Sequence, residues 1–344
     1  MILNTYTILF LFTAAVTGVL ALLLAFFSFR IFYASSRGLA PEERTDLENR
    51  SYLLLYIATV ILWVKLLSWP LFYFTLHSYV PYIHGAMCIF GVTQARLYSG
   101  STAQIIKPAV FFLAGAWLLL SGFDRRAETS PLFRRIILFL GVLSLVVLAD
   151  SVHDFMCLTS FDVTSDVSCC TTFFDLPDRA TASLSVSLIG HNYEKYLLPL
   201  YYLSNIMMIA FLTGARLKFV SAKNQDCSVM LLLISGAMLS LVNAAVTVIA
   251  LFEVIAPVVM ELPYHRCIYC MWQYAPGTVL MTGSFVLGTF SAGWALLIYL
   301  LGRHEETSGR LSVWLMNLYL SAIACLGASL VMAIIYMIIK RGHS

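Results

Sequence analysis

Residues 5–30 read TYTILFLFTAAVTGVLALLLAFFSFR and contain no charged side chain before Arg30. A hydrocarbon core about 30 Å thick requires roughly 20 apolar residues in one helix, and this stretch meets that requirement. No basic residue precedes the apolar run, which is longer than the core of a signal peptide and shows no obvious small-residue cleavage site. We therefore expect an uncleaved first transmembrane span.

Further apolar stretches of the same kind follow, so the sequence predicts an all-α polytopic membrane protein with about eight transmembrane helices. The expected spans are 5–30, 51–76, 104–122, 135–150, 195–215, 228–252, 276–301 and 311–338. The composition agrees, because 60% of the 344 residues are apolar and 11% are charged. A net charge of +3, spread over short clusters, argues against nucleic acid as a partner and leaves the lipid bilayer as the expected one.

Basic side chains gather in alternate loops, which sets the expected orientation. One set of loops holds thirteen of the 21 Lys and Arg residues: Arg30, Arg37, Arg44, Arg50, Arg125, Arg126, Arg134, Arg135, Arg216, Lys218, Lys223, Arg303 and Arg310. The opposite loops hold Arg96, Lys107, Arg179, Lys195 and Arg266. The positive-inside rule then places the first set in the cytoplasm and both termini outside. Lys340 and Arg341 argue against an outside C-terminus, and a re-entrant final helix would place that end in the cytoplasm.

Two segments of the chain resemble each other, which suggests an internal duplication. Residues 81–94 and 263–273 both contain Pro-Tyr, a His and then Cys-Ile followed by an aromatic residue, with a Gln six residues after the Cys. We therefore expect two tandem four-helix units, 1–150 and 195–344. The segment 151–194 between them is either an ordered cap or a flexible linker. Chance similarity between two aromatic interface segments is the alternative to duplication.

The eight cysteines are distributed unevenly. Six fall on or near the predicted outer face: Cys88, Cys157, Cys169, Cys170, Cys267 and Cys270. Disulfides persist in an oxidising compartment, so we expect a bacterial inner membrane with the cysteine-rich loops on its extracytoplasmic side. Cys169 and Cys170 are adjacent, and each is expected to pair elsewhere, with Cys157 the nearest candidate. These cysteines would either form structural disulfides in the 151–194 segment or relay electrons to the membrane.

Cys267-Ile-Tyr-Cys270 is a C-x-x-C motif at the predicted start of an apolar helix. Backbone N–H groups at a helix start stabilise a thiolate, and Arg266 adds positive charge, so the position favours thiol–disulfide exchange. His265 extends the string to His-x-Cys-x-x-Cys, which also suits a soft metal ion. A static disulfide or two buried apolar side chains is the structural alternative.

Polar residues inside spans are a second signal. Lys65 and Asn243 lie within predicted spans, where polar groups are costly and so indicate a functional site or a buried pair. Asp150 and Glu253, near the outer ends of spans, are the expected partners of such a lysine. Snorkelling of Lys65 to the interface is the alternative.

Aromatic side chains cluster near the predicted outer interface, as an aromatic belt does. A quinone headgroup would use the same region, stacking on Trp272 and accepting a hydrogen bond from Gln94 or Gln273. Haem is not expected, because none of the seven histidines lies in the middle of a span.

The stretch Cys267-Ile-Tyr-Cys-Met resembles the vitamin K epoxide reductase family. Members of that family carry such a pair at the outer end of a helix in a four-helix bundle, and shuttle electrons from loop cysteines to the pair and on to a quinone. The resemblance implies roles for Cys267 and Cys270 alone. Here the motif opens the third span of its unit instead of the fourth, and no loop pair lies between the first two helices of either unit.

Three functions follow from these observations. The leading hypothesis is a membrane thiol–disulfide oxidoreductase or electron relay, with Cys267 as nucleophile, Cys270 as resolving thiol and quinone as acceptor. Its partners would be an extracytoplasmic thiol protein or subunits of a membrane complex. The second is an outer-face site for Cu(I) or a similar soft metal ion, formed by His84, Cys88, His265, Cys267 and Cys270. The third is a structural subunit with no chemistry of its own.

Overall fold

The computed structural model describes residues 2–35, 41–95, 97–127, 130–161, 167, 174–176, 179–221 and 226–341. Helices account for most of these residues, and no strand occurs among them. The predicted all-α fold is therefore confirmed.

Among the described residues, eight helical segments are long and apolar enough to cross a membrane, as predicted. Six are single helices: α1 (Thr5–Ala34), α4 (Leu97–Asp124), α5 (Phe133–Thr159), α8 (Tyr193–Ser221), α12 (Gly277–Gly302) and α13 (Ser308–Arg341). The second span combines most of α2 (Pro41–Tyr79) with the 3-10 turn η1 (Val80–Tyr82). The sixth span in chain order joins three pieces, namely α9 (Asp226–Ala250), the π-helical turn η2 (Leu251–Ile255) and α10 (Ala256–Met260).

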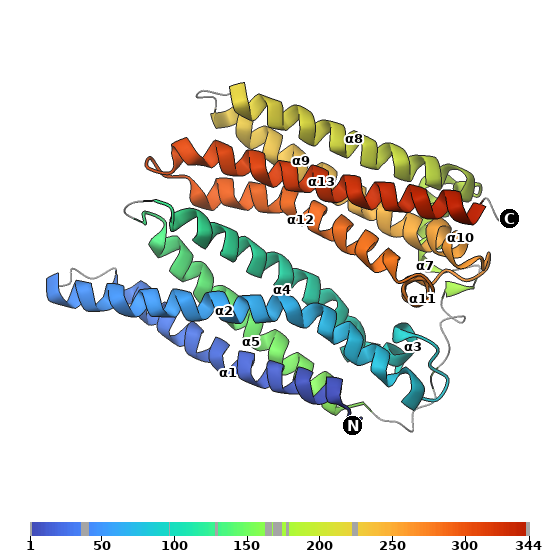
Figure 1. The fold of residues 1–344 in the computed structure, drawn as a ribbon, viewed down its shortest axis with the longest axis horizontal. Helices are drawn as coiled ribbons and strands as arrows, with labels where there is room; N and C mark the ends of the chain where they lie inside the picture. Colours follow the sequence, from blue (N-terminus) through green and yellow to red (C-terminus); the bar gives the residue numbers. More distant parts are fainter. Residues whose placement is uncertain are drawn as a thin grey trace. The chain divides into compact units, whose positions relative to one another are not determined.

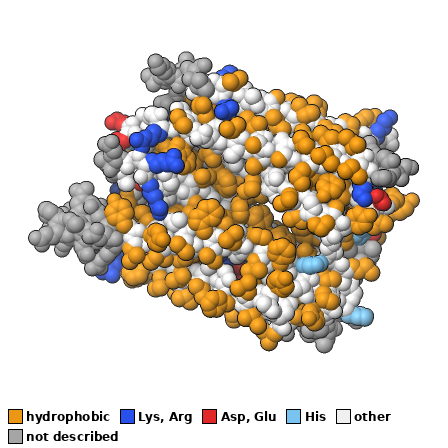
Figure 2. Space-filling model, in the orientation of Figure 1, with side chains coloured by type: hydrophobic (Ala, Val, Ile, Leu, Met, Phe, Trp, Pro, Cys, Tyr) orange, Lys and Arg blue, Asp and Glu red, His pale blue; other side chains and the backbone are white. Residues whose placement is uncertain are grey.

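The outer surfaces of these helices are apolar. Large side chains such as Leu22, Phe26 and Leu231 are exposed over 55%, 61% and 68% of their surface. Figure 2 shows apolar side chains spread over the helical surface on the face in view. Because exposing so much apolar surface to water is unfavourable, the fold suits a lipid bilayer.

Helix α5 continues well past its predicted end at residue 150. Cys157 therefore lies buried on α5, and its predicted place in the following loop is wrong. The segment looked like a loop because Asp150, His153 and Asp154 are polar. Its two carboxylates are buried and pair with lysines on other helices, so the helix stays inside the bundle.

The helix bounds settle two further points. Lys107 was counted with the loop residues although the predicted span 104–122 contains it, and it lies inside α4 and is buried. Helix α13 runs without a break from Ser308 to Arg341, so the final span is not re-entrant. Within 151–194, the helix α7 (Ala180–Ile189) shows that this part of the segment is ordered.

The first of two compact units comprises Met1–Val167 and Leu301–Thr307. Its long helices α1, α2, α4 and α5 run side by side in Figure 1, with α1 packed along α5 and α2. The side chain of Asn4 caps α1 by accepting the N–H of Thr7 at 2.9 Å. Between α2 and α4 the chain forms the 3-10 turn η1 (Val80–Tyr82) and the short helix α3 (Ile89–Gln94). We call this end of the unit, where α1 begins and α2 ends, the α3 end.

The second unit comprises Ser168–Leu300 and Ser308–Ser344. In it α8 packs against α9 and α13, and α7 contacts α8 and η2. Glu261 adopts a left-handed conformation with φ 59° and ends α10, after which the chain turns into the short helix α11 (Ile268–Tyr274). Helix α11 contacts α10, and its Ile268 and Met271 belong to the apolar core of the unit.

Candidate dithiol site and its surroundings

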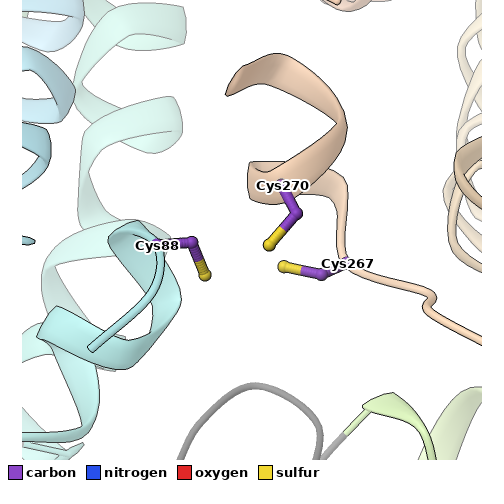
Figure 3. A group of neighbouring side chains, drawn as sticks. All are labelled: Cys88, Cys267 and Cys270. Atoms are coloured by element: carbon purple, nitrogen blue, oxygen red, sulfur yellow. The ribbon is translucent and has the colours of Figure 1, made fainter. Parts of the chain in front are cut away.

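The C-x-x-C motif forms the start of α11, as predicted. Cys267 is the residue before the helix and has an extended backbone, with φ −101° and ψ 117°. Its carbonyl oxygen accepts the N–H of Met271 at 3.0 Å, which closes the first turn. Residues three apart on a helix lie on the same face, so Cys270 returns to the side of Cys267. Figure 3 shows the two sulfur atoms turned toward each other, and they lie within 4.8 Å.

The two cysteines differ in the exposure of their side chains. Cys267 is completely buried, whereas Cys270 is partly exposed. The turn between them is held by Ile268 and Met271, which are buried in the core of the second unit. Because this anchor fixes the backbone, the distance between the sulfur atoms is set by the fold of the unit.

Arg266 is paired with two carboxylates. Its Nη2 donates to Oε1 of Glu194 at 2.9 Å, and its Nε lies 3.3 Å from Oε2 of Glu253. The sequence suggested that this positive charge would act on the neighbouring thiol. Since two carboxylates share the guanidinium, much of its field is offset before it reaches Cys267.

Glu253 is the centre of a buried polar network. It lies in the π-helical turn of the sixth span, and its Oε1 accepts the Nε–H of Arg179 at 2.8 Å. The Tyr193 hydroxyl donates to Oε2 at 2.9 Å, and the Thr181 hydroxyl donates to Oε1. Burial lowers the pKa of the Arg179 guanidinium, but its bonds to Glu253 outweigh this, so the pKa of Arg179 is raised above its ordinary value. Glu253 was expected to pair with a lysine, and it pairs instead with arginines.

The predicted histidine ligands lie in different settings. His265 Nδ1 lies 3.1 Å from both carboxylate oxygens of Asp175, in the second unit. His84 is exposed in the first unit, and its carbonyl oxygen accepts the N–H of Val167 at 3.2 Å. A carboxylate partner fixes the orientation of an imidazole ring, as it does for metal-bound histidines. The soft-metal alternative therefore stays a prediction.

The predicted quinone residues also divide between the units. Gln94 ends α3 in the first unit and is partly exposed. Trp272 and Gln273 lie on α11 in the second unit, where Gln273 is exposed. The Trp272 ring packs edge-on against Tyr269, with the ring centroids 5.2 Å apart. This edge-to-face aromatic pair offers the kind of surface that a planar headgroup contacts.

The first unit contains a cysteine in the same local setting as Cys267. Cys88 precedes α3 with an extended backbone, and its carbonyl oxygen accepts the N–H of Val92 at 3.2 Å. Figure 3 labels it where α3 begins. The position corresponding to Cys270 is Gly91, where an added Cβ would lie 3.0 Å from the Cα of Ala86. A second cysteine is therefore disfavoured at this turn by lack of space.

Lys65 is buried beside Asp150, as the sequence suggested, and the pair belongs to a larger cluster. Lys107 and Asp154 complete it, and neither was identified from the sequence. A spacing signal was available, because Asp150 and Asp154 are four residues apart and share one face of a helix. Asn243 has a different surrounding: its Nδ2 donates to Oδ1 of Asn205 at 3.2 Å.

The loop cysteines Cys169 and Cys170 lie outside the described residues. Comparison of the chain with protein-family models, with curated proteins and with solved structures found no match.

Proposed function

We propose that the protein is a membrane thiol–disulfide electron relay whose working pair is Cys267 and Cys270. The observation that carries the proposal is the pair of sulfur atoms within 4.8 Å of each other on a turn anchored in the core. A disulfide bond is about 2.0 Å long, so rotation of the two side chains is enough to form it. The resemblance to vitamin K epoxide reductases, limited to this motif and the four-helix units, supports the same chemistry.

In the proposed reaction the disulfide form of the pair accepts two electrons from an extracytoplasmic thiol protein. A donor thiolate attacks one sulfur atom and forms a mixed disulfide, and the second donor thiol then displaces the reduced pair. The donor becomes a disulfide and the pair a dithiol. A quinone then takes two electrons and two protons from the dithiol, which restores the disulfide and gives the quinol.

Burial favours an order of attack opposite to the one suggested by the sequence. An incoming donor reaches the partly exposed Cys270 before the completely buried Cys267. Cys270 would then form the mixed disulfide with the donor, and Cys267 would leave as the free thiol. With glutathione disulfide as the probe, Cys267→Ser should accumulate the mixed disulfide on Cys270, whereas rapid accumulation on Cys267 in Cys270→Ser would restore the original order.

The proposal places the pair on the extracytoplasmic side of a bacterial inner membrane. The distribution of thirteen basic residues in one set of loops supports this orientation. An oxidising compartment on that side would supply the thiol proteins on which such a relay acts.

The test uses the full chain, reduced, freed of reductant and reconstituted in nanodiscs. Adding a short-chain quinone should remove two thiols from those that a mass-tagged maleimide can label, and should produce one quinol per chain. Cys267→Ser and Cys270→Ser should both lose this reaction, and Cys325→Ser, which changes a cysteine on α13, should keep it. Persistence of both thiols in the presence of quinone would overturn the proposal.

The same preparation distinguishes the soft-metal alternative. A metal site predicts that alkylation of Cys267 and Cys270 is blocked until a chelator is added, and that Cu(I) copurifies with the wild-type chain. His265→Ala should then weaken the protection. That outcome would replace the redox proposal with metal binding.

A further inference from the structure

A cluster of four charged side chains lies inside the first unit, away from the cysteine pair. Lys65 on α2 places Nζ 2.6 Å from Oδ2 of Asp150 on α5. Lys107 on α4 places Nζ 2.8 Å from Oδ1 of Asp150 and 2.5 Å from Oδ2 of Asp154. All four side chains are at most 2% exposed. We call these four residues the charge cluster.

The simplest reading of the charge cluster is mechanical. Two ammonium groups balance two carboxylates, and the pairs join α2 and α4 to α5. Charges inside a membrane-spanning bundle are costly even when they are paired, and apolar residues of similar size would join the helices as well. The cluster therefore calls for a reason beyond packing.

The bonding of the two carboxylates is unequal. Both oxygens of Asp150 receive a lysine ammonium group. Asp154 receives both lysines on Oδ2, at 2.5 Å and 3.5 Å, while its Oδ1 is buried and has no hydrogen-bond partner among the residues that the structure describes. A buried carboxylate oxygen without a donor is unfavourable, and a proton on that oxygen removes the negative charge that it carries.

Neighbouring side chains stabilise the lysines of the charge cluster, but none in the described part of the chain donates a hydrogen bond to Oδ1 of Asp154. Lys107 Nζ lies 5.5 Å from the ring centre of Phe10 and 5.4 Å from that of Phe72, so two aromatic faces stabilise its charge. Helix α1 adds the hydroxyl of Thr17, which lies 3.2 Å from that of Ser151. The titratable groups facing Asp154 are thus Lys65 from α2, Lys107 from α4 and Asp150 on α5, with Cys157 one turn further along.

At the α3 end of the unit Tyr79, Thr7, Asn4 and Ser78 are joined by side-chain hydrogen bonds, in which the Asn4 amide separates the Thr7 and Ser78 hydroxyls. The Tyr79 hydroxyl lies 2.8 Å from the hydroxyl of Thr7. Thr7 donates to Asn4 Oδ1 at 3.0 Å, and Asn4 Nδ2 donates to the Ser78 hydroxyl at 2.8 Å. Ser78 borders an open pocket of about 380 Å³, lined also by Tyr6, Phe74, His77, Val80 and Pro81.

We propose that Asp154 is a proton-binding group in the interior of the first unit, and that its proton exchanges with water at the α3 end past the Tyr79 hydroxyl. On uptake, an O–H bond forms at Oδ1 of Asp154 and the proton comes from water in the pocket. On release the same bond breaks and the proton returns to water. The proposal does not depend on the redox chemistry of the cysteines.

The test is infrared spectroscopy of the full chain in lipid vesicles at stepwise lowered pH. Protonation of Asp154 should produce a carboxylic-acid C=O band that shifts in D₂O. The band should be lost in Asp154→Asn and retained in Asp124→Asn, a control in the same unit whose carboxylate lies outside the charge cluster and accepts the N–H of Leu132. If the wild-type chain shows no such band, or if the band is unchanged in Asp154→Asn, the proposal is wrong and the charge cluster serves only to join the helices.

Two further variants keep the test decisive. If Asp154→Asn fails to fold, as judged by helix content and elution volume, Asp154→Glu should show the band at a shifted frequency, and an unshifted band would contradict the assignment. Tyr79→Phe should keep the band but slow its exchange from H₂O to D₂O. Exchange as fast as in the wild-type chain would overturn the route past the Tyr79 hydroxyl.

Discussion

The Nε atom of Arg266 lies 3.3 Å from Oε2 of Glu253, one residue before the buried Cys267. Glu253 also binds Arg179, so one carboxylate in the sixth span holds two guanidinium groups. The pairing ties the start of the C-x-x-C turn to α7 and to the π-helical turn. Changes in Glu253 should therefore affect both the stability of the unit and the environment of the thiols.

Glu253→Gln should destabilise the second unit by about 3–5 kcal/mol, because it leaves the Arg179 and Arg266 charges without their buried partner. Glu194→Gln is the matched control, since the Glu194 side chain is 59% exposed and its ion pair with Arg266 contributes about 0–1 kcal/mol. Thermal unfolding in detergent, followed by circular dichroism, measures both. Equal effects of the two variants would show that the buried network is not what stabilises this region.

Gly91→Cys should destabilise the first unit by about 1–3 kcal/mol, because its Cβ would lie 3.0 Å from the Cα of Ala86. Gly283→Ala on α12 is the control: an added Cβ there meets no atom within 4 Å, and the change should be neutral or stabilising by about 0.5–1 kcal/mol. Unfolding midpoints of the two variants provide the comparison. A Gly91→Cys chain as stable as the wild type would mean that space does not explain the missing second cysteine.

Tyr264→Cys and Glu305→Cys should be labelled from opposite sides of the membrane. Tyr264 precedes the C-x-x-C turn and is 78% exposed, and Glu305 lies in the exposed loop between α12 and α13. The charge distribution predicts that a membrane-impermeant maleimide reaches position 264 in intact cells and position 305 after permeabilisation alone. Peptide mass spectrometry reads each site, and labelling of both in intact cells would contradict the orientation.

Lys107→Met should destabilise the first unit by about 3–5 kcal/mol, because it leaves a buried negative charge on Asp150 and Asp154. Adding Asp154→Asn removes one charge of the opposite sign, so the double variant should recover part of that loss. A double-mutant cycle on unfolding free energies measures the coupling. Strictly additive effects would show that the two side chains do not interact.

The spans were predictable because their physical cause is local. A run of apolar residues such as 5–30 has one stable state in a bilayer, and no knowledge of distant residues is needed to recognise it. The start of α11 was predictable for a similar reason, since the C-x-x-C motif opens an apolar helix. The surroundings of that motif were not: Glu194 lies 72 residues from Arg266 in the chain, and nothing local indicates their pairing.

The charge cluster marks the limit of sequence reasoning more clearly. Asp150 and Asp154 ended the predicted span because charged residues are rare inside a membrane. Their partners Lys65 and Lys107 lie on other helices, so the compensation appears only when the helices are packed. The end of α5 beyond residue 150 and the role of Lys107 were therefore missed for the same reason: the charges compensate one another only across different helices.

The π-helical turn Leu251–Ile255 gives the sixth span one residue more than a regular α-helix of that length would hold. Deleting a single residue there, such as Val254, would let the turn relax into an α-helix. The five residues of a π turn cover about the same angle as four residues of an α-helix, so α10 would keep its face toward the core, with Val259 and Met260 still buried. Deleting a residue from the regular part of α9 would instead rotate α10 by about 100° and turn these side chains out of the core. The π turn therefore marks the place where the sixth span tolerates a change of length without changing the direction in which the chain approaches Cys267.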